Sequence, residues 1–477
     1  MIHYPEAGGA ADPSVREFLK RMQQAGINFH SILMLRGNDV FFEKYIHPFH
    51  KDMPHRMYSV TKSFVAIAVG CLLDEGKISL DDPIIQYFED KLPKTVSPFL
   101  KKQTIRDMLM MATCFSGSNW FLPEVTDRTR FYFAETPNRP SGTLFSYDST
   151  GSYVLGVLVE RVSGMSLLDY LKIKILNRIG GFENAQILKT NDGTPWGDSA
   201  MVCTSRALMN FARFVMNLGT WEGERLLSEE FLREATSLQI TTNLEGAIGY
   251  NQHGYGYQIW MNERGFSFHG MGGQFAICVP DEDFIFVCTG DNQYNALSAN
   301  TIFRGVFDCL LPQREEPFHE DTDLSVAMGE TDSEFAQKIS GKTFVLNENP
   351  MGVKWFRLDF SKDACAFVYE NAQGVKMLPF GMKKNVFGKF PQFGYSDDRG
   401  NAHEITDFTY DCAASAGWIE NKKIQLRVQI IDRYFGSLVA TFGFKDENTV
   451  AVRMIKHAED FLNEYNGWMA GKSSSLA

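Results

Sequence analysis

The sequence lacks the marks of several protein classes. Its longest apolar run, Phe64 to Leu73, has ten residues, whereas a helix that spans a bilayer needs roughly 20. None of the eight cysteines belongs to a C-x-x-C pair, and they lie in apolar or mixed stretches, which predicts reduced, buried thiols. Met1 to Asp12 contains no Lys or Arg and no apolar core, so no secretory signal is recognised and a cytoplasmic location is expected.

Positive charge is also in short supply. The chain has 47 Lys and Arg against 58 Asp and Glu, a net charge of −11, so we expect no nucleic-acid partner and no membrane partner. Hydrophobic residues make up 44% of the chain and aromatic residues 13%, which predicts a folded protein with large cores. A length of 477 residues predicts two or three domains.

The acidic excess is concentrated in one segment. Residues 313–334 hold eight acidic side chains and a single base, Arg314, and account for −7 of the net charge. Such a segment is typical of a solvated linker. We therefore predict a first domain of residues 1–312, an acidic linker of residues 313–334 and a second domain of residues 335–477.

The second domain has the pattern of half-buried antiparallel strands. Turn signals at 371–374, 397–400 and 445–448 separate its strand-like stretches, and residues 458–465 are predicted to form a closing helix. We predict a small β-rich accessory domain, similar to a barrel or a sandwich, whose role the residues leave open. Apolar residues alternate with polar ones at Ile424, Leu426, Val428 and Ile430, at Leu438, Ala440, Phe442 and Phe444, and at Val450, Val452 and Met454.

The first domain mixes helical and strand patterns, which predicts an α+β fold. Val60, Phe64, Ile67 and Cys71 recur at helical spacing, and Gly76 provides a stop for that helix. Further helices are predicted over 104–109, 151–162 and 297–311. A hairpin is predicted from strands 266–279 and 284–288, which flank the turn residues 280–283.

Ser59 and Lys62 form an S-x-x-K pattern at the start of the first of these helices. Residues three apart lie on one helix face, so the ammonium group can reach the hydroxyl. A serine hydroxyl is a poor nucleophile until a neighbouring base takes its proton, and free N–H groups at a helix start favour a developing oxyanion. Taken alone, the same pattern is also expected of a surface helix capped by serine.

Two further elements follow along the chain. Tyr147, in Tyr147-Asp148-Ser149, carries a phenol that loses its proton more readily near a lysine, so it is a candidate base for Ser59 and acid for a leaving group. Taken alone, it is also expected of a turn with Ser149 as helix cap. The stretch 268–274 places His269, Gly270 and Gly272 on a strand, where glycines favour close approach of a substrate to the backbone or else mark a bulge.

Other catalytic patterns are absent or weak. His47, His50 and His55 precede Ser59 without an H-E-x-x-H pattern or a carboxylate partner, so a solvent loop is favoured over a metal site. The G-x-S-x-G elbow of other serine hydrolases does not occur. We expect neither a metal nor an organic cofactor.

Taken together and in this order, these motifs resemble those of the penicillin-recognising serine hydrolases, in the branch of class C β-lactamases, DD-peptidases and related esterases and amidases. The resemblance covers roughly residues 20 to 312. The matching stretches lie at 31–37, 43–45, 55–64, 76–83, 104–109, 116–117, 147–149, 205–219 and 254–260, followed by His269.

The resemblance implies an antiparallel sheet flanked by helices, with the site between a sheet edge and a helical region. It makes Ser59 the acylated nucleophile, Lys62 its proton partner and Tyr147 the second base or acid. His269 matches the position of the Lys in K-T-G, and the N–H groups of Ser59 and Gly272 would form the oxyanion hole. The third position of K-T-G is a glycine, but here it is Met271, with Gly270 and Gly272 on either side. The assignment of the second oxyanion donor is therefore left open.

Two departures from the family pattern shape the expected substrate. Ser149 replaces the Asn that would grip a substrate amide, and His269 replaces a fixed ammonium with a group that is mostly neutral at pH 7. We therefore predict an acyl-enzyme hydrolase of a small ester or a non-peptidoglycan amide. A true β-lactamase, a D-amino-acid peptidase and a non-catalytic ligand-binding sensor remain alternatives, and the oligomeric state is left open.

Overall fold

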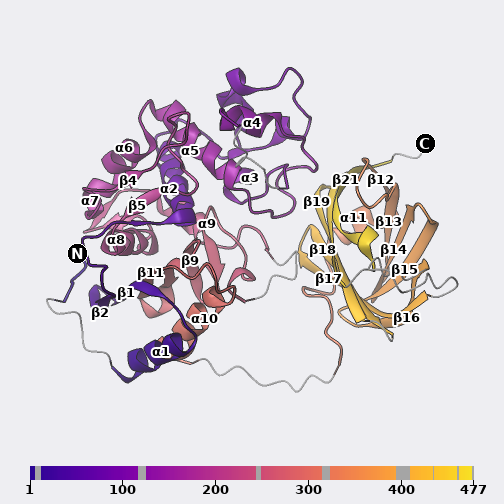
Figure 1. Ribbon diagram of the computed structural model, residues 1–477. Coiled ribbons are helices and arrows are strands. Elements are labelled where there is room, and N and C mark those ends of the chain that lie inside the picture. Colours follow the sequence, from indigo (N-terminus) through magenta and orange to yellow (C-terminus); the bar gives the residue numbers. More distant parts are fainter. Residues whose placement is uncertain are drawn as a thin grey trace.

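The structure is a computed structural model that describes residues 1–5, 12–116, 125–242, 249–313, 323–393, 409–432, 435–458 and 461–474. Figure 1 shows two bodies: an α+β domain built from the first two thirds of the chain, and a β-rich domain that contains the C-terminal strands. Each has a hydrophobic core of its own.

The first domain is organised around a six-stranded antiparallel sheet in the order β2-β1-β11-β10-β9-β8. Its strands come from both ends of the domain, since β1 (Phe29–Arg36) pairs with β11 (Phe284–Gly290). The remaining strands are β2 (Asp39–Tyr45), β8 (Trp260–Asn262), β9 (Gly265–Gly270) and β10 (Gln274–Val279). All six residues of β10 are buried, as expected of a strand covered on both faces.

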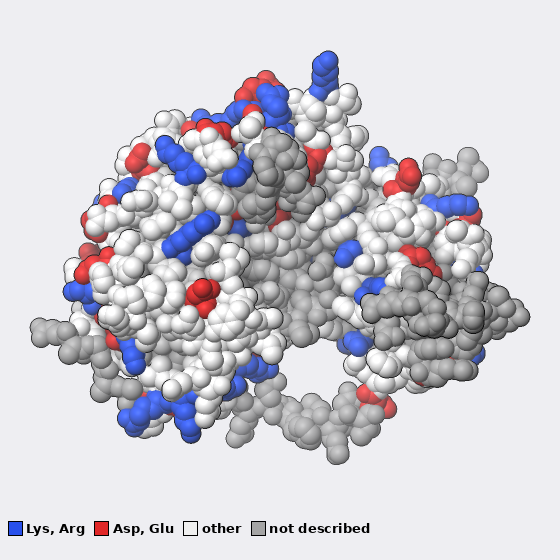
Figure 2. All heavy atoms as spheres, in the orientation of Figure 1, with Lys and Arg blue, Asp and Glu red and all other residues white. Residues whose placement is uncertain are grey.

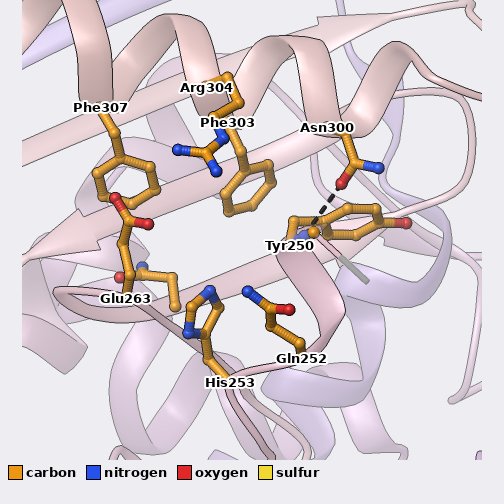
Figure 3. A pocket seen from close by; sticks show the side chains of 10 residues that line it. Tyr250, Gln252, His253, Glu263, Asn300, Phe303, Arg304 and Phe307 are labelled. Atoms are coloured by element: carbon orange, nitrogen blue, oxygen red, sulfur yellow. Dashed lines mark hydrogen bonds between the residues drawn. The ribbon is translucent and has the colours of Figure 1, made fainter. Parts of the chain in front are cut away.

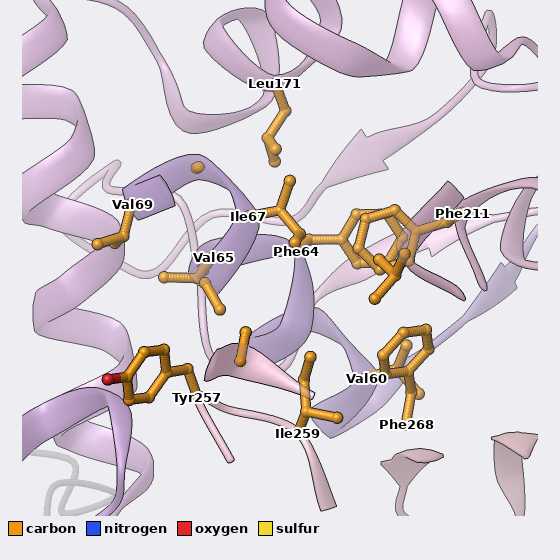
Figure 4. Packing of buried hydrophobic residues seen from close by; sticks show 14 of the residues in the cluster. Val60, Phe64, Val65, Ile67, Val69, Leu171, Phe211, Tyr257, Ile259 and Phe268 are labelled. Carbon is orange, nitrogen blue, oxygen red and sulfur yellow. The ribbon is translucent and has the colours of Figure 1, made fainter. Parts of the chain in front are cut away.

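Helices cover both faces of this sheet. On one face, α1 (Pro13–Gln24) packs with α10 (Ser298–Gly305), which continues in a wider turn through Leu310. The other face carries α2 (Thr61–Asp74) and α8 (Ser205–Met216). Nearly every residue of α2 is buried, because a second layer of helices covers it from outside, and Figure 4 shows Phe64 stacked on Phe211 between helix and sheet.

The predicted helices near the site are confirmed. α3 (Ile105–Leu109) begins with Thr104 as its cap and Asp107 completing a capping box, and α5 (Ser149–Ser163) ends at Gly164 in a left-handed conformation. The other elements of the domain are α4 (Arg128–Ala134), α6 (Leu167–Leu171), α7 (Asn177–Ile179), α9 (Glu229–Ala235), β3 (His55–Arg56), β4 (Gln186–Ile187), β5 (Met201–Cys203), β6 (Thr220–Trp221) and β7 (Glu224–Arg225).

The long strand predicted over 266–279 is wrong. The chain turns at residues 271–273 and folds back, so that β9 and β10 form a hairpin and Gly270 pairs with Gln274. Gly272 and Gly273 have φ of +84° and +98°, a region that glycine occupies without strain. An apolar pattern does not distinguish one long strand from two strands joined by a tight turn, and here the glycines marked the turn.

The second domain is a β-barrel. Ten strands follow one another in the order β15-β14-β13-β12-β21-β20-β19-β18-β17-β16, and a parallel pairing of β15 with β17 closes the ring. The predicted alternation is confirmed, because its apolar residues form the barrel core. The elements are α11 (Ala336–Ile339), β12 (Thr343–Leu346), β13 (Trp355–Phe360), β14 (Ala364–Asn371), β15 (Gly374–Met382), β16 (Val386–Phe393), β17 (Thr409–Glu420), β18 (Lys423–Ile431), β19 (Phe435–Asp446), β20 (Thr449–His457) and β21 (Gly467–Ser473).

Two details of this domain differ from the sequence prediction. The closing element is the strand β21, preceded by a single helical turn at Asn463–Tyr465, rather than a helix over 458–465. Part of the acidic segment lies on the barrel: Ala327 N–H donates to Ser415 Oγ at 2.9 Å, and Glu330 exchanges backbone hydrogen bonds with Trp418. Residues 314–322 and the turn predicted at 397–400 lie outside the described residues.

On the face shown in Figure 2, Lys and Arg are interspersed with Asp and Glu, and broad uncharged areas lie between them. The eight cysteines are free, and seven of them are buried. Within the described ranges, no helix combines the length and the apolar character that a membrane crossing requires.

Candidate active site

Ser59 lies in a tight turn, Tyr58–Val60, that leads directly into α2. The residue before it, Tyr58, has a φ of +48°, a strained conformation for a residue with a side chain. The Thr61 hydroxyl holds the turn from inside, because it donates to Tyr58 O at 2.6 Å and accepts from Met201 N–H at 2.9 Å. These two hydrogen bonds fix the conformation of the turn that carries Ser59.

Lys62 reaches back to Ser59, as the S-x-x-K spacing predicted. Its Nζ donates to Ser59 Oγ at 2.9 Å and to the backbone oxygen of Asp198 at 2.8 Å. The lysine side chain is only 1% exposed. A buried ammonium is costly unless other groups compensate its charge, so these contacts hold Nζ at the hydroxyl in one geometry.

A carboxylate that the sequence analysis did not select lies beside this pair. Asp198 Oδ2 is 4.0 Å from Lys62 Nζ, and the Asp198 side chain is buried. Burial raises the pKa of Asp198 to about 6, against the opposing effect of the Lys62 charge. Asp198 stands in a loop before β5 with no motif around it, so only the fold shows that it belongs to the site.

Tyr147 covers Lys62 from the solvent side. Lys62 Nζ lies 5.1 Å from the centre of the Tyr147 ring, and Tyr147 is 37% exposed. Asp148, rather than Ser149, caps α5, since its carboxylate accepts from Gly151 N–H at 2.9 Å. Ser149 is the half-buried first residue of the helix. Ser59, Lys62 and Tyr147 are therefore brought together by the fold.

The end of β9 packs against the segment that carries Ser59. A Cβ atom on Gly270 would lie 2.3 Å from the backbone oxygen of Met57, so only glycine fits there. A substrate was expected to approach the backbone closely at this glycine, but the group that approaches it is the backbone of Met57. Because β8 pairs only with Gly265, Phe266 and Ser267, the edge of β9 beyond Ser267 is left uncovered by the sheet.

His269 points away from this edge. Side chains alternate along a strand, so Phe268 faces the core around α2, while His269 faces Phe275 and the α10 residue Phe303. Its Nε2 shares a hydrogen bond of 2.7 Å with Ser267 Oγ, and its Nδ1 has no partner among the described residues. Burial lowers the pKa of His269 to about 3, so the ring is neutral at ordinary pH.

Trp260 separates His269 from the catalytic candidates. Its ring stacks on His269 with centres 5.4 Å apart, and on Tyr147 with centres 5.7 Å apart. The family pattern places residue 269 among the substrate contacts. The structure instead places it behind an indole that supports Tyr147. Trp260 is the last residue of the family-like stretch 254–260. That membership was the one feature of the sequence that could have pointed to Trp260 as part of the site.

Gly272 lies in the β9–β10 turn. Its backbone oxygen accepts from Asn292 N–H at 3.0 Å, and a Cβ atom at this position would lie near Gly290, at the end of β11, and Gln293. Gly270 O accepts from Gly273 N–H at 3.3 Å, so the polar groups of Gly270 point toward β10.

Among the histidines before Ser59, His55 contacts another histidine, His30. His55 Nε2 and His30 Nδ1 share a hydrogen bond of 2.8 Å, and the His30 ring stacks on Phe49. Across the described ranges, no group of three or more His, Cys, Asp or Glu side chains is arranged to hold a metal ion.

A separate pocket of about 220 Å³ lies between α10, β8 and residues 249–253 (Figure 3). Arg304, Glu263 and His253 lie around it, and the rings of Tyr250 and Phe303 form part of its wall. Tyr250 and Phe303 also contact the ring of His269. Its lining includes none of the three catalytic candidates.

Comparison with known proteins places this geometry in a family. The family model named Beta-lactamase matches residues 15–302, more than half of the chain. The chain belongs to the β-lactamase family. It is a hydrolase of this family, and the predicted relationship to the penicillin-recognising serine hydrolases is confirmed.

Individual relatives extend the likeness beyond the first domain. The 6-aminohexanoate-dimer hydrolase of Paenarthrobacter ureafaciens is 26% identical over 282 residues, which cover 54% of this chain and 71% of the relative. The octameric penicillin-binding protein homologue from Pyrococcus abyssi has a TM-score of 0.51 at 17% identity, covering 96% of this chain and 99% of its own. SurE, solved with D-Leu, has a TM-score of 0.51 at 15% identity, covering 92% and 97%. The last two share the fold along nearly the whole chain.

Proposed function

We propose that this β-lactamase family member hydrolyses small esters or amides through an acyl-enzyme on Ser59. The observation that carries the proposal is the contact of 2.9 Å between the buried Lys62 Nζ and Ser59 Oγ. A nucleophile within hydrogen-bond reach of a base, with the base itself held by a third group, is the geometry that activates a serine. Asp198 is that third group.

The reaction has two halves. Ser59 Oγ bonds to the substrate carbonyl carbon, and its proton passes to Lys62 Nζ in the amine form. The bond between the carbonyl carbon and the leaving oxygen or nitrogen breaks. The Tyr147 hydroxyl gives its proton to the departing alcohol or amine and takes up a proton from Lys62. Water then attacks the carbonyl carbon of the Ser59 ester and gives a proton to Lys62. A proton returns to Ser59 Oγ as the acid leaves, which restores the hydroxyl.

Two backbone N–H groups would stabilise the oxyanion in this scheme. One is that of Ser59, in the first turn before α2, where helical N–H groups lack partners within the helix. For the other we assign the N–H of Met271, the residue that directly follows the end of β9 at Gly270, in place of that of Gly272. Preorganised donors of this kind contribute about 3 kcal/mol each to transition-state stabilisation.

The substrate class follows from the groups that surround Ser59. A penicillin or a D-Ala terminus carries a carboxylate that benefits from a permanent cation at position 269. Here that position holds a neutral histidine turned toward α10. This arrangement favours substrates without a required carboxylate, such as short-chain esters, or linear amides of the kind named for the Paenarthrobacter relative.

The test is covalent labelling of the full-length protein with a fluorophosphonate, followed by intact mass and peptide mapping. We expect one adduct, on Ser59, and hydrolysis of an activated short-chain ester. Both should be absent in Ser59→Ala and unchanged in Ser237→Ala, which removes an exposed hydroxyl. Wild-type protein that gains no adduct and turns over neither esters nor linear amides would contradict the proposal and favour a ligand-binding sensor.

A panel of substrates separates the alternatives. We expect short esters and linear oligoamides to be hydrolysed at least tenfold faster than a chromogenic cephalosporin and D-amino-acid amides. Faster hydrolysis of the cephalosporin would establish a true β-lactamase, and faster hydrolysis of D-amino-acid amides would establish a peptidase.

A further inference from the structure

The segment that leads to Tyr147, residues 138–146, lies between the two domains. Three backbone hydrogen bonds attach it to the first domain, donated by Asn138, Gly142 and Ser146 to the carbonyl oxygens of residues 114, 112 and 111. We call residues 138–146 the approach segment. Because it ends one residue before Tyr147, any displacement of it moves the Tyr147 ring.

The barrel packs against the outer side of the approach segment. Leu144 is fully buried in a small cluster with Ala451, Ile419 and Trp468 of the barrel. The backbone of Gly443 on β19 lies so close that a Cβ atom there would be 2.7 Å from Leu144 Cδ2 and 3.0 Å from Thr143 O. These contacts come from several barrel strands, so they depend on the whole folded barrel.

Arg139 makes the contact between the domains more specific. Its side chain is completely buried, and its guanidinium lies 4.0 Å from the centre of the Trp468 ring. Nε and Nη2 of Arg139 have no hydrogen-bond partner among the described residues, and Nη1 donates to Asn138 Oδ1. The aromatic face of Trp468 and the negative charge of the buried Asp148 both favour the charged form of this guanidinium.

The inner side of the approach segment continues into the active site. Phe145 packs on Trp260 with ring centres 5.7 Å apart and on Tyr255 at 5.4 Å. Trp260 stacks in turn on Tyr147. A continuous set of contacts thus runs from Trp468 and Ala451 of the barrel through Leu144 and Phe145 to the phenol above Lys62.

We propose that the C-terminal barrel positions Tyr147 for proton transfer, with Trp468 and Gly443 as positioning residues. This proposal rests on the proposed function, because it assigns the barrel a role in the step that Tyr147 performs. Without the barrel, Leu144 and the guanidinium of Arg139 would face water, and the approach segment would lose the surface against which it is held. The barrel then influences catalysis through the approach segment and Tyr147, without touching the substrate.

Two substitutions test the contact in opposite ways. Trp468→Ala removes the surface under Arg139, whereas Gly443→Ala pushes on Leu144 from the barrel side. For each, we expect kcat for the activated ester to fall about tenfold with KM unchanged, and the pH profile of kcat to shift, because the proton donor is displaced. Trp468→Phe, which keeps an aromatic face, should restore most of kcat. Phe387→Ala, at a residue 66% exposed on β16, is the control and should match the wild type.

A second measurement does not depend on turnover. Hydrogen exchange should become faster at the amides of Gly142 and Ser146 in Trp468→Ala and Gly443→Ala, but not in Phe387→Ala. Unchanged kcat and unchanged exchange in both interface variants would overturn the positioning role and leave the proposed function intact. A wild-type protein without turnover or labelling would overturn the proposed function instead. In that case, faster exchange in Trp468→Ala and Gly443→Ala would still show that the barrel holds the approach segment.

Discussion

At the scale of single residues, the main feature is a lysine buried beside a serine and a carboxyl group. Lys62 is enclosed by Ser59, the backbone of Asp198 and the ring of Tyr147. Burial raises the pKa of the Asp198 carboxyl group to about 6, against the opposing effect of the Lys62 charge.

We expect Asp198→Asn to lower kcat by about tenfold to a hundredfold, the usual range for loss of a group that tunes general acid–base catalysis. The Asn side chain is nearly isosteric, and the backbone oxygen that binds Lys62 remains. KM should therefore change little. Steady-state kinetics with the activated ester measures both constants. A variant with wild-type kcat would show that the carboxylate has no part in proton transfer.

The buried histidine gives a prediction for stability. In the folded state the pKa of His269 is about 3, against about 6.5 in an unfolded chain, so below pH 6.5 the unfolded state binds the additional proton. Stability from this group is complete above pH 6.5 and is lost as the pH falls toward 3. From pH 7 to pH 5 it amounts to about 2 kcal/mol.

Denaturant unfolding at pH 5 and pH 7 checks this prediction. We expect the free energy of unfolding of His269→Gln to depend less on pH than that of the wild type, by about the same 2 kcal/mol. His457→Gln, which alters an exposed histidine, is the matched control. An equal pH dependence in the wild type and His269→Gln would show that His269 titrates normally in the folded protein.

The sequence was informative about residues whose spacing is local. Ser59 and Lys62 are three apart on one helical turn, so their contact follows from helix geometry alone. Asp198 and Trp260 reach the site from distant loops and strands, and no local pattern reports such a meeting. His269 was placed on the correct strand, but the face that it occupies depends on register, which a slip of one residue reverses.

At the scale of elements, the hairpin of β9 and β10 determines the shape of the site. The turn at residues 271–273 ends β9 beside the Ser59 turn, and the edge of β9 beyond Ser267 is not covered by β8. A single long strand, as the apolar pattern predicted, would have continued past Ser59. The glycines of this stretch do mark a close approach to the backbone, as predicted. Gly270 makes room for the backbone of Met57, and Gly272 and Gly273 form the turn.

Gly270→Ala tests the contact between this hairpin and the segment that carries Ser59. The new Cβ would lie 2.3 Å from Met57 O, and backbone atoms cannot swing aside as a flexible side chain can. We expect kcat/KM for the ester to fall about a hundredfold and the free energy of unfolding to fall by about 1–3 kcal/mol, the usual cost of overpacking.

Gly388→Ala is the matched control for that experiment, since the same change in β16 meets no atom within 4 Å. It should leave kcat/KM unchanged and alter stability by less than about 1 kcal/mol. Wild-type kinetics in Gly270→Ala would show that the distance between β9 and Ser59 has no influence on the reaction.

At the scale of the whole molecule, two hydrophobic cores are joined through a small contact area. Leu144 and Ala451 are both fully buried where the domains meet, and Glu420 Oε1 of the barrel accepts from Thr241 N–H at 2.9 Å. Composition and strand alternation were enough to predict a β-rich second domain. They gave no indication of which surface of that domain faces the catalytic one.

Leu144→Asp is expected to uncouple the two domains. An unpaired carboxylate at a buried contact costs several kcal/mol, which exceeds what a small interface supplies. Scanning calorimetry should show two separate transitions for the variant where the wild type shows one. Phe387→Asp, on the exposed face of β16, should retain the wild-type profile. A single transition in Leu144→Asp would mean that the coupling lies elsewhere.

The stacking of Trp260 between Tyr147 and His269 has an optical consequence. Indole emission responds to the polarity and motion of its neighbours, and this indole contacts the phenol that transfers a proton in the proposed reaction. Because His269 remains neutral over the working pH range, its charge adds no background signal. If Ser59 is acylated as proposed, we expect one of the seven tryptophans, Trp260, to report that step in a rapid-mixing fluorimeter as the difference between wild type and Trp260→Phe.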